Sequence, residues 1–165
     1  FQVAADEARD LAVLGEKIRV AAREQLKAVH PENPGISGVS IVQLNRPYAG
    51  PGKPTRNTCI VSPGRSGRSP TGTGTSARMA VLHAKGQMKV GDTLIHESII
   101  GSHFTGRIIG ETTAGGKPAI LPTIEGRAFI TGTMSYFLDP ADPWTDGYRV
   151  ADTWGVNGST SMTQS

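Results

Sequence analysis

The sequence contains a single cysteine, Cys59, in 165 residues, which excludes an intrachain disulfide and a cysteine metal cluster. No apolar run approaches the roughly 20 residues that a membrane-spanning helix needs. The formal net charge is only +3 and the basic residues are scattered, so a nucleic-acid-binding face is not indicated. The four histidines include no pair at a metal-ligand spacing, and no metal site is expected. These absences favour one globular domain without a signal peptide, for which we expect a cytoplasmic location.

The hydrophobic pattern predicts two helices. Apolar residues recur at three to four positions from Asp6 to Val29, and His30-Pro31 ends that helix. A second helix is expected from about Thr73 to Lys85, and its apolar residues lie on nearly every face, which predicts that it is buried. Short strands separated by turns are expected at 39–44, 58–62, 93–100, 104–109, 118–123 and 127–133. The fold class is therefore α+β, with a curled, mostly antiparallel sheet around a buried central helix.

The most informative segment is the glycine-rich loop that precedes the second helix, within residues 66–80. A P-loop would need a lysine where Thr73 stands, and the dinucleotide-binding fingerprint does not match either. A small-anion site remains, most simply for a carboxylate held by the N–H groups of Gly72 and Thr73 and by the Thr73 hydroxyl. The alternative interpretation is a tight strand-to-helix turn without a ligand.

The same loop resembles the second active-site motif of the proline racemase family, which includes 4-hydroxyproline epimerases and trans-3-hydroxy-L-proline dehydratases. The resemblance covers almost the whole chain, and its segments are 14–18, 68–80, 90–92, 96–102, 104–107, 130–132 and 138–144. It implies a diaminopimelate epimerase-like half, with residues 1–154 as the C-terminal catalytic half and residues 155–165 as a polar tail. In that family two such halves grip the substrate between two helix N-termini. The first half is expected either in a longer chain of which this sequence is a part or on another chain, and this half alone is expected to be inactive. Family members often pair as homodimers.

The resemblance also implies a reaction. Racemases and epimerases of the family use two cysteines on opposite faces of the substrate α-carbon, and the second cysteine belongs at the position of Thr71. A hydroxyl is a poor α-proton base near neutral pH, because its pKa lies far above that of a thiol. The pairing of cysteine with threonine is what trans-3-hydroxy-L-proline dehydratases show. We therefore expect a cofactor-independent dehydratase, in which a first-half cysteine removes the α-proton and Thr71 assists loss of the 3-hydroxyl.

The remaining site residues follow from the same resemblance. Asn57 is expected to hydrogen-bond the substrate, although a structural role is equally compatible with the sequence. Gly67 stands where the motif usually carries an aspartate that would pair with the ring ammonium. Cys59 lies in a predicted strand twelve positions before Thr71 and is interpreted as a small buried thiol that does not replace the missing cysteine. His96 and Glu97 are adjacent, so we expect them on opposite faces of a strand, in structural hydrogen bonds.

Two alternatives stay open at this point. The first is a proline racemase or 4-hydroxyproline epimerase, against which Thr71 argues. The second is a degenerate, non-catalytic homologue that only binds an imino acid, which Gly67 and the absent first half leave open. In each case the expected partner is a small imino acid such as hydroxyproline.

Overall fold

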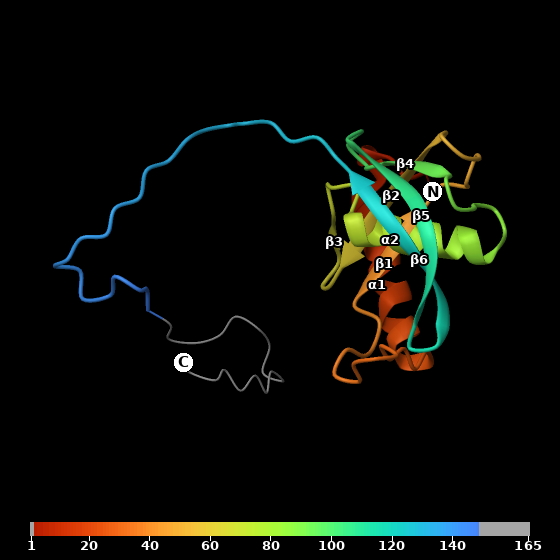
Figure 1. Cartoon of the computed structure of the whole chain (residues 1–165), viewed down its shortest axis with the longest axis horizontal. Helices are drawn as coiled ribbons and strands as arrows, with labels where there is room; N and C mark the ends of the chain where they lie inside the picture. The colour runs from red at the N-terminus through yellow and green to blue at the C-terminus, as the bar shows by residue number, and fades with distance from the viewer. Residues whose placement is uncertain (1, 149–165) are drawn as a thin grey trace. The chain divides into compact units, whose positions relative to one another are not determined.

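The computed structural model describes residues 2–148, which form two units divided after Ala128. The first unit contains every helix and strand among the described residues (Figure 1). Its helices are η1 (Ala5–Glu7), α1 (Ala8–Gln25) and α2 (Gly72–Ala84). Its strands are β1 (Ile41–Asn45), β2 (Pro54–Val61), β3 (Arg65–Ser66), β4 (Thr93–Glu97), β5 (His103–Ala114) and β6 (Lys117–Glu125). Neither helix α1 nor helix α2 is long and apolar enough to cross a membrane.

The strands form one mixed sheet in the order β1-β2-β4-β5-β6, with β3 paired to β2. Only the β2–β4 pair is parallel within the described residues, which confirms the predicted mostly antiparallel α+β fold. The parallel pair arises because α2 forms the crossover between β2 and β4. This crossover carries the chain from the glycine-rich loop directly into α2.

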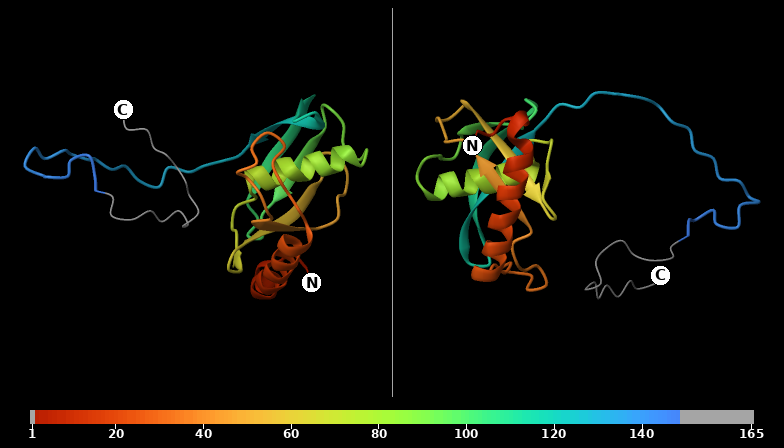
Figure 2. Two further views of the ribbon diagram at one scale, coloured as in Figure 1. Left: turned by 90° about the horizontal axis from the view of Figure 1, so that it is seen from below. Right: turned by 180° about the vertical axis from the view of Figure 1, so that it is seen from behind.

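The two helices contact different strands. Helix α1 packs on β1, β2 and β3, whereas α2 packs on β4, β5 and β6, and Figure 2 shows the two helices running across one another. The core beneath α2 contains Met79, Leu82, Met88, Leu94 and Ile108. Gly106 on β5 permits this close packing, since a Cβ atom there would lie 2.7 Å from Met79 Cε.

The expected burial of the second helix on all faces is wrong for the described structure. Thr75, Met79 and Leu82 are its buried residues. Thr73, Ala77 and Val81 recur at four-residue spacing and form an exposed stripe. The reason is that the described strands pack against one side of α2, so short apolar side chains on the other side stay in contact with solvent.

The prediction of a strand at 127–133 is also wrong. Residues 126–139 have no regular secondary structure, and residues 121–148 are exposed. A strand needs a neighbouring strand to pair with, and none of the strands in the described sheet pairs with residues 127–133. The second described unit, from Phe129 to residue 148, is therefore an extended segment with turns near its end. The predicted polar tail, 155–165, lies outside the described residues.

Candidate active site

The first turn of α2 opens onto a cavity of about 630 Å³. The cavity is lined from the loop before β1, from β1 and β2, and from the glycine-rich loop, by Gly38, Val39, Ser40, Ile41, Gln43, Cys59, Val61, Gly67, Thr71, Gly72, Thr73, Gly74 and Ala77. The structure thus brings together four of the five predicted site residues, Gly67, Thr71, Gly72 and Thr73. No charged side chain is among these described lining residues, so the cavity offers hydroxyl, thiol, amide and backbone groups instead.

Thr71 is the residue at which the chain enters α2. It has φ 62° and ψ 113°, and it is the only described non-glycine residue with a positive φ. Its side chain makes no capping hydrogen bond to the helix; Oγ1 instead donates to Pro70 O at 2.6 Å. The first-turn N–H groups, which a capping side chain would otherwise partly satisfy, are therefore available to an anion.

Cys59 lies much closer to Thr71 than the sequence separation indicates. Its Sγ atom is 3.3 Å from Thr71 Oγ1, and the residue is only 4% exposed. The single Thr71 hydroxyl hydrogen points to Pro70 O, so the Cys59 S–H group donates to Thr71 Oγ1. Burial raises the pKa of the Cys59 thiol. The predicted burial is confirmed, and Cys59 also lines the cavity beside Thr71, because β2 passes directly beneath the loop.

Hydrogen bonds of Asn57 and Gly67 join the glycine-rich loop to β2. The Asn57 side chain is fully buried and does not line the cavity; its amide donates to Pro70 O at 3.2 Å and to Glu97 O at 3.1 Å. Gly67 does line the cavity, and its N–H donates to Cys59 O at 2.8 Å. A Cβ atom at Gly67 would lie 3.4 Å from that oxygen, so the position has nearly enough room for a side chain.

A buried polar network lies behind the first turn of α2. Thr75 Oγ1 is 2.6 Å from Thr71 O and 2.8 Å from His96 Nδ1. On the other side of the imidazole, Nε2 lies 3.4 Å from Gln43 Nε2 and 3.1 Å from Asn45 Oδ1. Burial, and secondarily the charge of Arg78, lower the pKa of His96 to about 4, so the ring is neutral near neutral pH.

His96 and Glu97 point in different directions, as the strand pattern predicts. His96 belongs to the buried network, whereas Glu97 accepts a hydrogen bond from Arg56 Nε at 3.0 Å. This ion pair lowers the pKa of Glu97. Sequence reasoning missed Gln43 in the cavity and held no signal for it, because its position follows from the register in which Gln43 pairs directly with Cys59 across β1 and β2.

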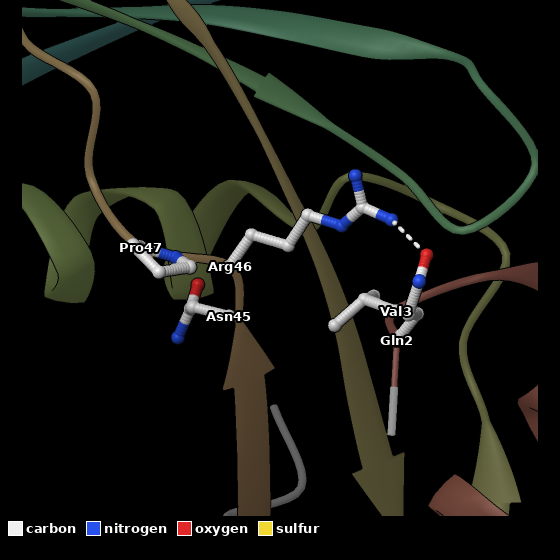
Figure 3. A pocket seen from close by; sticks show the side chains of 5 residues that line it. All are labelled: Gln2, Val3, Asn45, Arg46 and Pro47. Carbon is white, nitrogen blue, oxygen red and sulfur yellow. Dashed lines mark hydrogen bonds between the residues drawn. The ribbon is translucent and has the colours of Figure 1, made fainter.

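A second, smaller cavity of about 370 Å³ lies beside the end of β1. Gln2, Val3, Asn45, Arg46 and Pro47 line it, and Arg46 Nη2 donates to Gln2 Oε1 at 3.1 Å (Figure 3). None of the predicted site residues belongs to it. Within residues 2–148 no group of three or more metal-ligating side chains comes together.

The fold and the site define this chain as an α+β domain in which the uncapped N-terminus of α2, Thr71 and Cys59 line one cavity. The chain belongs to the proline racemase family, whose model, described as proline racemase, matches residues 1–149.

Two solved structures illustrate this relationship. A probable proline racemase from Agrobacterium radiobacter K84, with bound carbonate, is 41% identical at a TM-score of 0.75. A hydroxyproline epimerase from Agrobacterium vitis, with bound trans-4-hydroxy-L-proline, is 38% identical at a TM-score of 0.75. Each comparison covers 94% of this chain but only 45% and 44% of the respective relative. The chain therefore spans less than half the length of these relatives.

Proposed function

We propose that this chain provides one half of the active site of a trans-3-hydroxy-L-proline dehydratase. The observation that carries the proposal is the hydroxyl of Thr71 at the helix N-terminus, in the position where the family resemblance calls for a thiol. A hydroxyl can donate a hydrogen bond to a leaving group, but it does not exchange α-protons near neutral pH.

The substrate carboxylate would bind at the start of α2. The N–H groups of Gly72 and Thr73 and the Thr73 hydroxyl line the same cavity as Thr71, and the helix dipole favours an anion there. Because no charged side chain is among the described lining residues, the ring ammonium would be paired by the first half of the enzyme. Both solved relatives carry a ligand with a carboxylate or carbonate group.

The reaction is an elimination that needs no cofactor. A cysteine thiolate of the first half removes the α-proton, and the electron pair of that C–H bond forms the ring double bond as the 3-hydroxyl leaves. The Thr71 hydroxyl, turned from Pro70 O toward the substrate, donates a hydrogen bond to the departing oxygen. The removed proton and the hydroxyl leave together as water, and the enamine tautomerises to pyrroline-2-carboxylate.

Epimerisation of a hydroxyproline is the second candidate, and the contact between Cys59 and Thr71 is the observation that favours it. A thiol 3.3 Å from Thr71 Oγ1 could act as the second base if it moved into the cavity. The raised pKa of Cys59 argues against this role, since a buried thiol stays protonated near neutral pH. The dehydratase is therefore the preferred function.

The deciding experiment follows trans-3-hydroxy-L-proline and trans-4-hydroxy-L-proline by proton NMR in deuterated water, with the natural full-length chain. Dehydration predicts pyrroline-2-carboxylate from the 3-hydroxy substrate and no epimer from either substrate. Cys59→Ala should retain this dehydration. An epimerase that relies on Cys59 as its second base would instead lose its epimerisation activity in that variant. Accumulation of an epimer would refute the dehydratase, and saturable binding without turnover would identify a non-catalytic binder.

A second variant tests the placement of Thr71. Thr71→Cys restores a thiol opposite the first-half base and should introduce deuterium at the α-carbon of the remaining substrate. Thr71→Ser, which keeps a hydroxyl, is the matched control and should introduce none. A folded, ligand-binding Thr71→Cys protein that incorporates no deuterium would show that Thr71 does not face the α-carbon.

A further inference from the structure

Thr71 is held in a conformation that its own side chain disfavours. A β-branched residue at φ 62° and ψ 113° is a steric outlier, and such conformations are energetically unfavourable. They persist only where surrounding groups hold them. Three side chains do so here: Ser69 Oγ accepts from Thr71 N at 3.0 Å, Asn57 holds Pro70 O, and Thr75 contacts Thr71 O.

The Thr75 hydroxyl makes the shortest of these contacts. Its Oγ1 atom is 2.6 Å from Thr71 O, and a carbonyl oxygen can only accept, so the single hydroxyl hydrogen is donated there. The same oxygen is 2.8 Å from His96 Nδ1. Because Thr75 has already used its hydrogen, His96 Nδ1–H must be the donor in that contact.

The rest of the network accommodates this tautomer with one unfavourable contact, since Asn45 Oδ1, itself an acceptor, lies 3.1 Å from Nε2. In a neutral imidazole protonated at Nδ1, Nε2 is an acceptor, and the Gln43 amide nitrogen at 3.4 Å is its donor. The second amide hydrogen of Gln43 goes to Asn45 Oδ1 at 2.8 Å. The network therefore runs from Gln43 in the wall of the cavity, through His96, to Thr75 and the carbonyl of Thr71. Thr75 and His96 are both 0% exposed, so water does not replace these bonds.

We propose that Thr75 and His96 are positioning residues: His96 orients the Thr75 hydroxyl, which fixes the carbonyl of Thr71 and so sets the direction in which Thr71 Oγ1 points. The catalytic part of this inference rests on the proposed function, whereas the conformational part does not. Neither residue lines the cavity, and neither touches the substrate in this arrangement. Their effect on the reaction passes through Thr71.

The test compares variants of the natural full-length chain that differ by one hydroxyl. Thr75→Val removes the hydroxyl bond to Thr71 O, leaves the backbone bond from Thr75 N to that oxygen at 2.9 Å, and keeps the β-branched shape. It should lower kcat about 10- to 100-fold with little change in KM, because misplaced groups lose turnover rather than affinity. Thr75→Ser keeps the hydroxyl and should restore most of the turnover. Thr55→Val is the matched control, since Thr55 is 3% exposed and its hydroxyl holds the carbonyls of Arg46 and Pro47 instead.

Two substitutions of His96 distinguish the roles of its two ring nitrogens. The side-chain amide introduced by His96→Asn reaches only as far as the Nδ1 position and can still donate to Thr75, whereas the longer side chain introduced by His96→Gln reaches toward Asn45. We therefore expect His96→Asn to retain more turnover than His96→Gln. Equal losses in the two variants, or equal effects of Thr75→Val and Thr55→Val on kcat, would assign these residues a purely structural role and overturn the proposal.

A spectroscopic measurement keeps this test independent of the reaction. The Cα and Cβ chemical shifts of Thr71 report its φ and ψ, and they should move toward ordinary values in Thr75→Val but not in Thr75→Ser or Thr55→Val. If the natural protein does not turn over either hydroxyproline, the proposed function fails, and these shifts still decide the conformational part. Unchanged Thr71 shifts in a folded Thr75→Val protein would overturn it.

Discussion

At the scale of single residues, Thr71 combines backbone strain with the candidate chemistry. Thr71 lines the cavity, and its hydroxyl accepts from Cys59 and donates to Pro70 O. A glycine would adopt this backbone without steric cost, so the side chain is present despite the strain it brings. Strained residues of this kind gather at functional sites, where the surrounding structure holds them.

The strain predicts an unusual order of stability. Thr71→Gly and Thr71→Ala both remove the hydroxyl, but only glycine relieves the steric strain of the positive φ. We expect Thr71→Gly to exceed Thr71→Ala in free energy of unfolding by about 1 kcal/mol, measured by urea denaturation. At an ordinary position alanine is the more stable of the two, so that order would contradict the strained conformation.

At the scale of elements, the start of α2 couples the sheet to the site. Strand β1 brings Gln43 and β2 brings Cys59 and Asn57 to the loop that begins the helix. At Gly74, in the first turn, the Gln43 side chain lies close to the helix. A Cβ atom there would lie 2.5 Å from Gln43 Oε1 and 2.6 Å from Thr71 Oγ1.

Two alanine substitutions in this turn should therefore differ. Both Gly72→Ala and Gly74→Ala favour the helix by up to about 1 kcal/mol through intrinsic propensity. Gly72 has open space around its Cβ position, so it should show this gain in urea denaturation. Gly74→Ala must displace Gln43 and Thr71, so it should show no gain and should shift the Thr71 resonances. Equal stabilisation by both variants would contradict the described packing.

At the scale of the whole molecule, His96 makes stability depend on pH. The pKa of its buried ring is about 4, whereas an unfolded histidine titrates near its ordinary value of 6.5. Below pH 6.5 the unfolded chain binds a proton that the folded chain does not bind, so the free energy of unfolding falls as the pH is lowered toward 4. Over that window the loss amounts to about 3 kcal/mol.

Urea denaturation of the natural protein and of His96→Asn between pH 7 and pH 4.5 measures the contribution of His96 to the pH dependence of stability. The other histidines are common to both proteins and cancel in the difference, and the lowered pKa of Glu97 places its own titration below this window. The natural protein should lose stability more steeply than the variant. Parallel profiles would show that folding does not lower the pKa of His96.

Sequence alone determined the features that depend on short segments. Hydrophobic periodicity and turn residues predicted α1, α2 and most strands, and Gly-Thr-Gly before an apolar run located the helix N-terminus to within one residue. The motif around Thr71 identified the family. These features are local because hydrogen bonding within a helix and turn geometry involve residues close in the chain.

Tertiary structure decided which distant residues share the site. Gln43 and Cys59 lie together at the cavity because the β1–β2 register pairs them, and a slip of β1 by one residue would turn Gln43 to the other face. Burial of Asn57 beneath the loop and the hydrogen bond from His96 to Thr75 likewise depend on strand order and on how closely α2 packs on the sheet. A one-dimensional pattern contains no register or crossing geometry, so it could name Thr71 but not the groups that hold it.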